Sequence, residues 1–295
     1  MKDLYPTFDI NNLSTCNSIN EIFSIDRFSE YLEGNPKTTK VHRHSFYHIA
    51  YFAKGAGENI MDFKSYEVAP GSIFLMRPGQ VHNWILNENV EGYVVNFSST
   101  FFDQLQINSS LIDQFPFFNL FPSDQMIVLS ENNTDKMKAY FEDIISESSN
   151  PNGSSQIMIA AILLQIFALA DKEIDSKAAF NKTNYNSLIF KQFIELIEAN
   201  FQEIKLPKDY ASLLNITPNH LNFICKQQID LSAGEIIRNR IILEAKRLLV
   251  NFDLSIAAIA EKMNYFDNSN FVKFFKKHTG VTPEAFRKQY YSKSN

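Results

Sequence analysis

Two stretches near the C-terminus of this 295-residue chain repeat one pattern, and the repeat constrains the fold more than any other feature. In the first stretch, residues 206–214 have the pattern of a short helix, Asn215-Ile216-Thr217 interrupts it, and Pro218 opens a second helix that runs to about residue 226. Thr217 is a good N-cap, and proline at the first helical position loses no hydrogen bond that the helix needs. The order of helix, tight turn and helix predicts a helix-turn-helix unit.

The same arrangement returns in residues 255–278, with a turn that is one residue longer. Corresponding positions lie 49 residues apart up to the turn and 50 apart after it: Ala211 and Ala260, Asn215 and Asn264, Thr217 and Asp267, Leu221 and Phe271, Lys226 and Lys276. The small alanine lets the two helices of a unit cross closely, and asparagine tolerates the left-handed backbone of a turn. The chain therefore carries two copies of the unit.

One helix over about residues 232–249 is predicted to join the two units, because Ser232 and Glu235 have the spacing of a capping box. Its roughly 27 Å length is comparable with the 34 Å repeat of B-DNA. Residues 181–295 carry a net charge of +5, whereas residues 1–180 carry −10. Two units, a spacer and a local positive charge favour a DNA-binding domain over the alternative, an all-helical protein-interaction domain.

The residues of the second copy resemble the signature of AraC/XylS-type transcriptional regulators. The resemblance rests on Ala257-Ala258-Ile259-Ala260, on Met263-Asn264-Tyr265, on the run from Phe271 to Pro283, and on Phe286-Arg287. It covers about the last 105 residues. It implies a sequence-specific domain that places two recognition helices in successive major grooves, and it implies activation of transcription through contact with RNA polymerase.

The resemblance also implies roles for individual side chains. In the first recognition helix the base-facing positions hold Asn219, Asn222 and Phe223, and in the second they hold Asn268, Ser269 and Lys273. Asparagine pairs with adenine and lysine with guanine acceptors, while an apolar side chain contacts a thymine methyl group. The positions assigned to phosphates, which fix register without reading sequence, are Thr217, Lys226, Arg238, Lys276 and Lys277.

Three residues of the first unit depart from the family pattern. Phe223 stands where a basic residue is common, Cys225 where phenylalanine is common, and Asp230 where glycine is common. We therefore expect the second unit to supply more of the sequence specificity. In a gel-shift titration, Lys273→Ala is expected to weaken operator binding more than Asn222→Ala does, and the reverse order would contradict this ranking.

The N-terminal part changes to a strand pattern. Residues 46–53 are aromatic and β-rich, and turn signals follow at 54–57, 69–71 and 77–80. The spacing predicts an antiparallel sandwich or barrel. The expected fold class is α+β and multidomain, with an N-terminal antiparallel cupin-like β-barrel, flanking helices, and a C-terminal all-α domain of two helix-turn-helix units joined by a long helix.

Four of the six histidines lie in this part, at His42, His44, His48 and His82. The pattern, with Pro78-Gly79 ahead of His82, looks like a cupin and resembles the sensor domain in front of many AraC-type DNA-binding domains. The residue at His48 is usually glutamate in metal-binding cupins, so we favour a pocket for a small organic effector, lined by the four histidines with Arg77 and Trp84. Metal binding by the same histidines stays open as the alternative, since imidazole binds Zn, Fe and Ni well.

Between the two parts, residues 135–148 and 157–170 are predicted helices. The second is apolar nearly all round, so it must be buried, either as a homodimer interface, which we favour, or within its own chain. Its apolar run of 14 residues is shorter than a membrane span, and no secretory signal starts the chain. The expected domains are 1–105 for sensing, 106–180 for connection and dimerisation, and 181–295 for DNA binding, with a linker near 171–186.

The sequence thus predicts a cytoplasmic transcriptional regulator that is controlled by an effector and needs no cofactor. A rival reading is a metal-dependent cupin enzyme fused to a DNA-binding domain, which is weakened because no acid, base or nucleophile pattern accompanies the histidines. A third is a DNA-binding protein whose barrel senses nothing and only dimerises.

Overall fold

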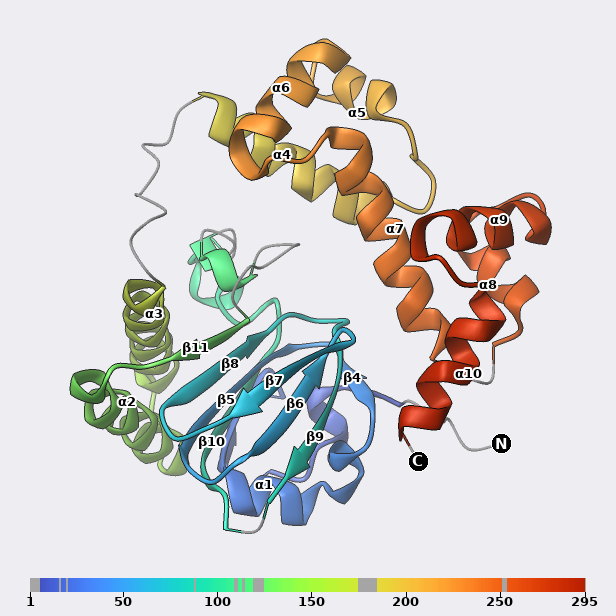
Figure 1. Ribbon diagram of the computed structural model, residues 1–295. Coiled ribbons are helices and arrows are strands. Elements are labelled where there is room, and N and C mark those ends of the chain that lie inside the picture. Colours follow the sequence, from blue (N-terminus) through green and yellow to red (C-terminus); the bar gives the residue numbers. More distant parts are fainter. Residues whose placement is uncertain are drawn as a thin grey trace. The chain divides into compact units, whose positions relative to one another are not determined.

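The computed structural model describes residues 6–294 except 16, 20, 88, 109–110, 113–114, 119–124, 175–184 and 251–253. The chain divides into two compact units, Tyr5–Lys177 and Ala178–Asn295 (Figure 1). Most of the predicted linker, including the expected boundary at residues 180 and 181, lies outside the described residues. Each unit is described separately below.

The N-terminal unit contains two sheets. The five-stranded sheet has the order β1 (Thr7–Phe8), β4 (His42–His44), β9 (Val81–Leu86), β6 (Gly57–Met61) and β7 (Lys64–Val68). The six-stranded sheet has the order β11 (Met126–Val128), β8 (Ser72–Met76), β5 (Tyr47–Lys54), β10 (Glu91–Phe97), β3 (Phe23–Arg27) and β2 (Asn17–Ile19). Neighbouring strands are antiparallel apart from the parallel pair β1–β4.

The predicted fold class, an N-terminal antiparallel β unit with flanking helices and a helical C-terminal unit, is confirmed, but the described strands form two sheets that do not close into a barrel. Closure requires the outer strands to pair with one another. Here the edge strand β1 of the five-stranded sheet has two residues, and the edge strand β2 of the six-stranded sheet has three. Turn signals along the sequence predict the strands but carry no information about this long-range pairing, and the sandwich form of the prediction is the one that the sheet order supports.

Alternation along the strands separates two cores. Ala50 and Phe52 of β5 face an inner core with Phe74 and Trp84, whereas Ile49 and Tyr51 of β5 belong to an outer core. The outer core also contains buried side chains of α2 (Glu131–Ser149) and α3 (Ser155–Glu173). The six-stranded sheet is thus buried on both faces. Its inner face packs toward the five-stranded sheet, and its outer face packs against α2 and α3.

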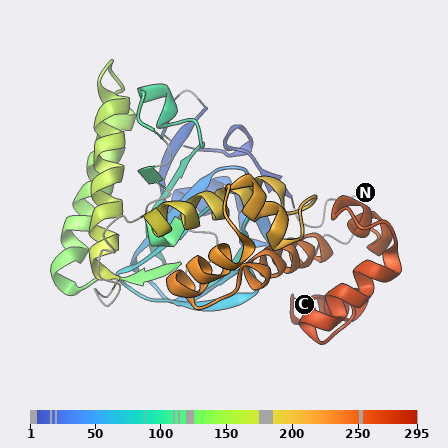
Figure 2. The same ribbon diagram turned by 90° about the horizontal axis from the view of Figure 1, so that it is seen from above.

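Helices α2 and α3 run side by side (Figure 2) and confirm the two helices predicted from the apolar pattern. By length and composition α3 would be able to cross a membrane, but half of its most apolar stretch is buried inside the unit, as in the core helix of a globular domain. Ile157 and Met158 nevertheless remain 58% and 47% exposed. The shorter elements of this unit are α1 (Phe28–Gly34) and the 3-10 helices Ile10–Asn12, Pro36–Thr39, Asp103–Leu105 and Pro116–Phe118.

The described part of the C-terminal unit is helical, as predicted. Its helices are α4 (Tyr185–Asn200), α5 (Pro207–Leu213), α6 (Pro218–Ile229), α7 (Ala233–Leu249), α8 (Ile256–Lys262), α9 (Asn268–Thr279) and α10 (Pro283–Ser294). The predicted caps are present: side-chain oxygens of Thr217, Ser255 and Asp267 accept backbone N–H groups of the first turns of α6, α8 and α9. Ser232 and Glu235 form the full capping box of α7.

The two turns also have the predicted backbone. Asn215 and Asn264 adopt φ angles of 56° and 52°, in the left-handed region that asparagine tolerates better than other side chains. The recognition helices α6 and α9 end in the same way, at Asp230 with φ 55° and at Gly280 with φ 81°. The duplication therefore extends to a left-handed cap, which glycine occupies without strain and aspartate does not.

This difference predicts opposite effects of substitution at equivalent positions. Asp230→Gly is expected to stabilise the C-terminal unit by about 0.5–1 kcal/mol, because the exposed ion pair with Lys226 that it removes contributes little. Gly280→Ala is expected to destabilise it by about 1–2 kcal/mol, although a Cβ there meets nothing within 4 Å. Urea unfolding followed by far-ultraviolet circular dichroism measures both, and effects of the same sign would contradict the prediction.

Candidate functional site

The four N-terminal histidines come together at one end of the space between the two sheets. His42 and His44 lie on β4 and His82 lies opposite His42 on β9, in the five-stranded sheet, whereas His48 reaches them from β5 in the other sheet. Two strands from different sheets thus carry His42, His44 and His48, although these residues are close in sequence. All four side chains are buried.

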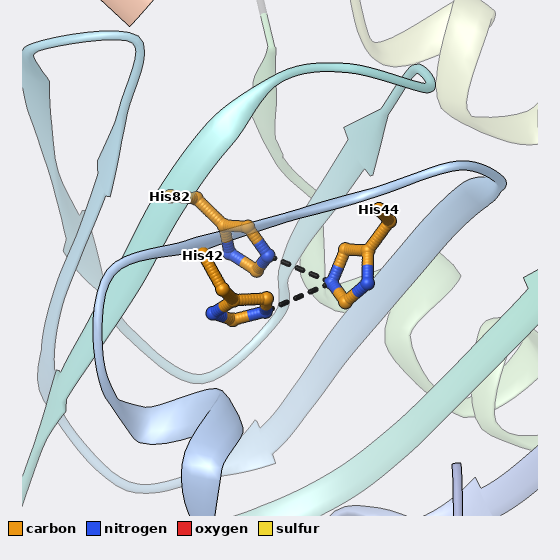
Figure 3. Close-up of side chains that lie close together, drawn as sticks. All are labelled: His42, His44 and His82. Carbon is orange, nitrogen blue, oxygen red and sulfur yellow. Dashed lines mark hydrogen bonds between the residues drawn. The ribbon is translucent and has the colours of Figure 1, made fainter. Parts of the chain in front are cut away.

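Three ring nitrogens converge on one point (Figure 3). Nε2 of His44 lies 3.0 Å from Nε2 of His42 and 2.9 Å from Nε2 of His82. The ring of His48 stacks on that of His44, with 4.7 Å between centroids. Phe8 of β1 packs edge-on against His42 and covers this end of the group.

Hydrogen bonds assign the proton positions of two of these rings. Nδ1 of His42 lies 2.7 Å from the carbonyl oxygen of Lys40, so Nδ1 is the donor and Nε2 carries a lone pair. Nδ1 of His48 lies 2.7 Å from Oδ1 of Asn96, whose amide nitrogen donates to Ser24. His48 therefore also turns an unprotonated Nε2 inward, and this buried atom has no hydrogen-bond partner.

Burial keeps these imidazoles neutral. Desolvation lowers the pKa of His42 to about 4 and that of His48 to about 3. The pKa values of His44 and His82 are also lowered well below the usual range, first by desolvation and then by repulsion from the neighbouring histidines. Neutral imidazole is the form that binds a metal ion or accepts a hydrogen bond from a ligand.

The interior beside the histidines contains further polar groups without partners. The indole N–H of Trp84 is buried and unbonded, and its ring stands 5.6 Å from that of His82. Asn59 of β6 pairs with Trp84 of β9. Its side chain is fully buried, and neither its amide nitrogen nor its amide oxygen has a hydrogen-bond partner. Buried amides are normally hydrogen-bonded, so these atoms point to a polar ligand. Sequence reasoning identified Trp84 but missed Asn59, whose only signal is its alternation with Gly57 and Met61.

Arg77, the remaining predicted pocket residue, follows the end of β8. It is half-buried, and its backbone N–H donates to Oε1 of Gln80. Its neighbour Met76 belongs to the inner core and pairs with His48 across β5 and β8. The backbone at Arg77 therefore lies near the end of the interior at which the histidines gather.

In α6, the three predicted base-reading residues have different environments. Asn219 and Phe223 are exposed, Phe223 to 58%, and the Phe223 ring stacks on that of His220. Asn222 is half-buried, and its Oδ1 accepts the backbone N–H of Ala233 at 3.0 Å. This bond ties α6 to the first residue of α7, a structural role that its spacing in the sequence did not indicate.

In α9, by contrast, Asn268, Ser269 and Lys273 are all exposed, at the start of the helix and one turn later. Of the predicted phosphate contacts, Lys276 and Lys277 are exposed on the last turn of α9. Lys226 donates to the carbonyl oxygen of Asp230, and Thr217 uses its hydroxyl oxygen to cap α6. Arg238, on α7, is half-buried.

Arg240 of α7 is not a surface cation. Its side chain is 7% exposed, its Nε lies 3.1 Å from Glu198 of α4, and its Nη1 lies 2.9 Å from Glu244 of α7. The guanidinium also stacks over Phe201. This cluster binds α4 to α7 and removes one positive charge from the surface available to DNA.

Two family models match the chain. A model described as an AraC-like ligand binding domain matches residues 30–167, and one described as a helix-turn-helix domain matches residues 210–289. The first covers strands β4 to β11, α2 and most of α3, whereas β1, β2 and β3 precede it. The second contains the whole second helix-turn-helix unit and the first unit from Tyr210 onward.

Named relatives match the same regions. The HTH-type transcriptional activator AarP of Providencia stuartii is 30% identical over 36% of the chain and 78% of its own length. The Msm operon regulatory protein of Streptococcus mutans is 23% identical over 97% of both chains. The match to the regulator YtdP of Bacillus subtilis, 32% identical, spans 13% of that protein. The solved structure of ToxT from Vibrio cholerae is 16% identical with a TM-score of 0.45, over 90% of this chain and 98% of that one.

Proposed function

Since the chain belongs to the AraC family of transcriptional regulators, we propose that it activates transcription from a bipartite operator in response to a small organic effector. The observation that carries the proposal is the duplicated helix-turn-helix with its exposed recognition helices, held in one unit by α7. The 17 residues of α7 have a length of roughly 25 Å. That spacing suits two readers in neighbouring turns of B-DNA.

Within this proposal α9 is the principal reader of sequence. Asn268, Ser269 and Lys273 are free to approach base edges, whereas Asn222 of α6 is engaged with the start of α7. Asn219 and Phe223 supply the base contacts of the first recognition helix, α6, and Phe223 does so by packing against a thymine methyl group. Thr217, Lys226, Arg238, Lys276 and Lys277 contact phosphates, so affinity falls steeply with added salt.

The effector site is assigned to the interior between the two sheets. Its lining consists of His42, His44, His48, His82 and Trp84, with Arg77 at its end and Asn59 as an addition from the structure. The unbonded polar atoms of Asn59 and Trp84 support a ligand that both donates and accepts hydrogen bonds. The aromatic side chains of the inner core favour a ligand with apolar parts.

Dimerisation is assigned to α3. Ile157 and Met158 leave an apolar strip exposed on a helix whose other face is buried against the sheet and α2. Burial of such a strip against a second copy removes apolar surface from water. A dimer would present four recognition helices to DNA. We place the regulator in the cytoplasm and propose that it contacts RNA polymerase there. The rival reading, a metal-dependent enzyme, finds no counterpart in the names of the relatives cited here, which are all regulators.

The test is selection of binding sites from random DNA with the full-length protein, followed by titration of the selected site. Enrichment of two half-sites about one helical turn apart is expected. Lys273→Ala is expected to weaken binding about 5- to 150-fold, the range for loss of one base-specific contact, and to relax selection at one position. Lys262→Ala, an exposed lysine on α8, serves as the matched control and is expected to have little effect. Absence of any enriched site would contradict the proposed function.

A further inference from the structure

The three converging histidine nitrogens present a proton-accounting problem. Nε2 of His42 carries a lone pair, because its Nδ1 donates to Lys40. The 3.0 Å contact between His42 and His44 therefore requires a proton on Nε2 of His44. That proton points toward Nε2 of His42, yet Nε2 of His82 also lies 2.9 Å from Nε2 of His44.

No arrangement of protons satisfies both contacts. If Nε2 of His82 is unprotonated, a single N–H of His44 must serve two acceptors. If it is protonated, two N–H groups point at each other. A cation at the convergence point resolves the conflict, because it accepts lone pairs from all three rings at once.

The separations suit a metal ion. Two imidazole nitrogens at about 2.0–2.1 Å from a tetrahedral zinc ion lie about 3.3 Å apart. The closest contacts here are 2.9 and 3.0 Å, and the ligand atoms of the three residues all lie within 4.8 Å of one another. Small rotations of the side chains therefore bring three nitrogens to bonding distance from one ion.

One of the three rings has the outer hydrogen bond typical of metal-binding histidines, whereas Nδ1 of His44 and Nδ1 of His82 are buried without a partner. The bond from His42 to the Lys40 carbonyl fixes its ring and its tautomer, as outer hydrogen bonds do for metal-binding histidines. The ring of His48 lies next to the three rings, with 5.3 Å between its centroid and that of His82. Its Nδ1 is hydrogen-bonded to Asn96, and its Nε2 has no hydrogen-bond partner. Neutral imidazoles in a buried site select zinc and its neighbours over magnesium or calcium, which prefer oxygen.

We propose that His42, His44 and His82 bind one zinc-type divalent ion in the N-terminal unit, with a fourth coordination position open beside His48. The same histidines line the proposed effector site, and the convergence of their nitrogens adds an ion to that lining. This inference goes beyond the proposed function, because ion binding here requires neither an organic effector nor DNA.

The test uses full-length protein that is stripped with a chelator and then loaded with Zn²⁺ or Co²⁺. After gel filtration we expect one metal ion per chain, and a tetrahedral Co²⁺ spectrum in the visible range that Zn²⁺ abolishes. His44→Gln is expected to lose the retained ion, or to bind it at least about 100-fold more weakly. His278→Gln, at an exposed histidine in the C-terminal unit, is the matched control and keeps full binding.

Circular dichroism separates loss of a ligand from loss of fold in His44→Gln. If that variant does not fold, the Co²⁺ spectrum of the unaltered protein and Asn96→Ala decide. Asn96→Ala is expected to weaken binding by less than about 10-fold, because Asn96 hydrogen-bonds His48, which is not one of the three ligands. Stripped protein that retains no ion, or folded His44→Gln that retains as much as the unaltered protein, overturns the proposal. Neither result affects DNA selection, so failure here is distinct from failure of the proposed function.

Discussion

Gly92→Ala is expected to unfold the N-terminal unit at temperatures where the unaltered protein is stable. A Cβ at Gly92 would lie 1.9 Å from the carbonyl oxygen of Tyr51, at a bulge where β10 pairs with β5. The clashing atom belongs to the backbone of β5, which is held between β8 and β10 and cannot rotate away. We expect a loss of at least about 3 kcal/mol, above the usual range for single substitutions.

The chain provides a specific probe for this unfolding. Its single tryptophan, Trp84, is buried in the inner core, so tryptophan fluorescence reports the N-terminal unit alone. Gly153→Ala is the matched control, because a Cβ there meets nothing within 4 Å, and its effect should stay within about 0.5 kcal/mol. A fluorescence midpoint for Gly92→Ala equal to that of this control would show that the strand pairing at the bulge is wrong.

The second large effect is expected at Arg240. Arg240→Ala removes a guanidinium that pairs with Glu198 and Glu244 and stacks on Phe201. Both carboxylates then lose this partner, and Glu244, which is 14% exposed, keeps the longer contact of 3.8 Å with Arg247. Removal of one partner from a buried ion pair costs about 3–5 kcal/mol. Because α4 and α7 both pack against α6, the same variant should lose most of its DNA binding.

Far-ultraviolet circular dichroism during urea unfolding follows this loss, while the Trp84 fluorescence midpoint should not move. Lys288→Ala, which breaks the exposed pair between Lys288 and Glu284, is the control and should change stability by less than about 1 kcal/mol. An Arg240→Ala protein as stable as this control would mean that the cluster contributes nothing to holding α4 on α7.

The C-terminal unit was predicted well because its signals are local. A cap such as Thr217 and a left-handed turn residue such as Asn264 act on the few residues beside them, so their spacing alone indicates helix ends. What the spacing missed depends on contacts between helices. Asn222 and Arg240 occupy positions that look like surface positions in the sequence, but packing against α7 and α4 gives both of them structural partners.

In the N-terminal unit the strands were predictable and their assembly was not. Alternation indicates which side chains share a face, whereas closure into a barrel depends on pairing between strands distant in sequence. The histidines illustrate both sides of this limit. The four histidines were expected to line one pocket, but the arrival of His48 from the opposite sheet and the meeting of three Nε2 atoms at one point depend on how the two sheets pack together.

We expect the short strand β1 to set how quickly anything bound at the histidines exchanges with solvent. It has two residues and pairs with one neighbour, β4, and such segments open at far lower free energy than a whole domain unfolds. Its opening lifts Phe8 from His42 and His44 while the two sheets stay intact. We therefore expect the residence time at this buried site to depend on the fraying of this strand, separately from affinity.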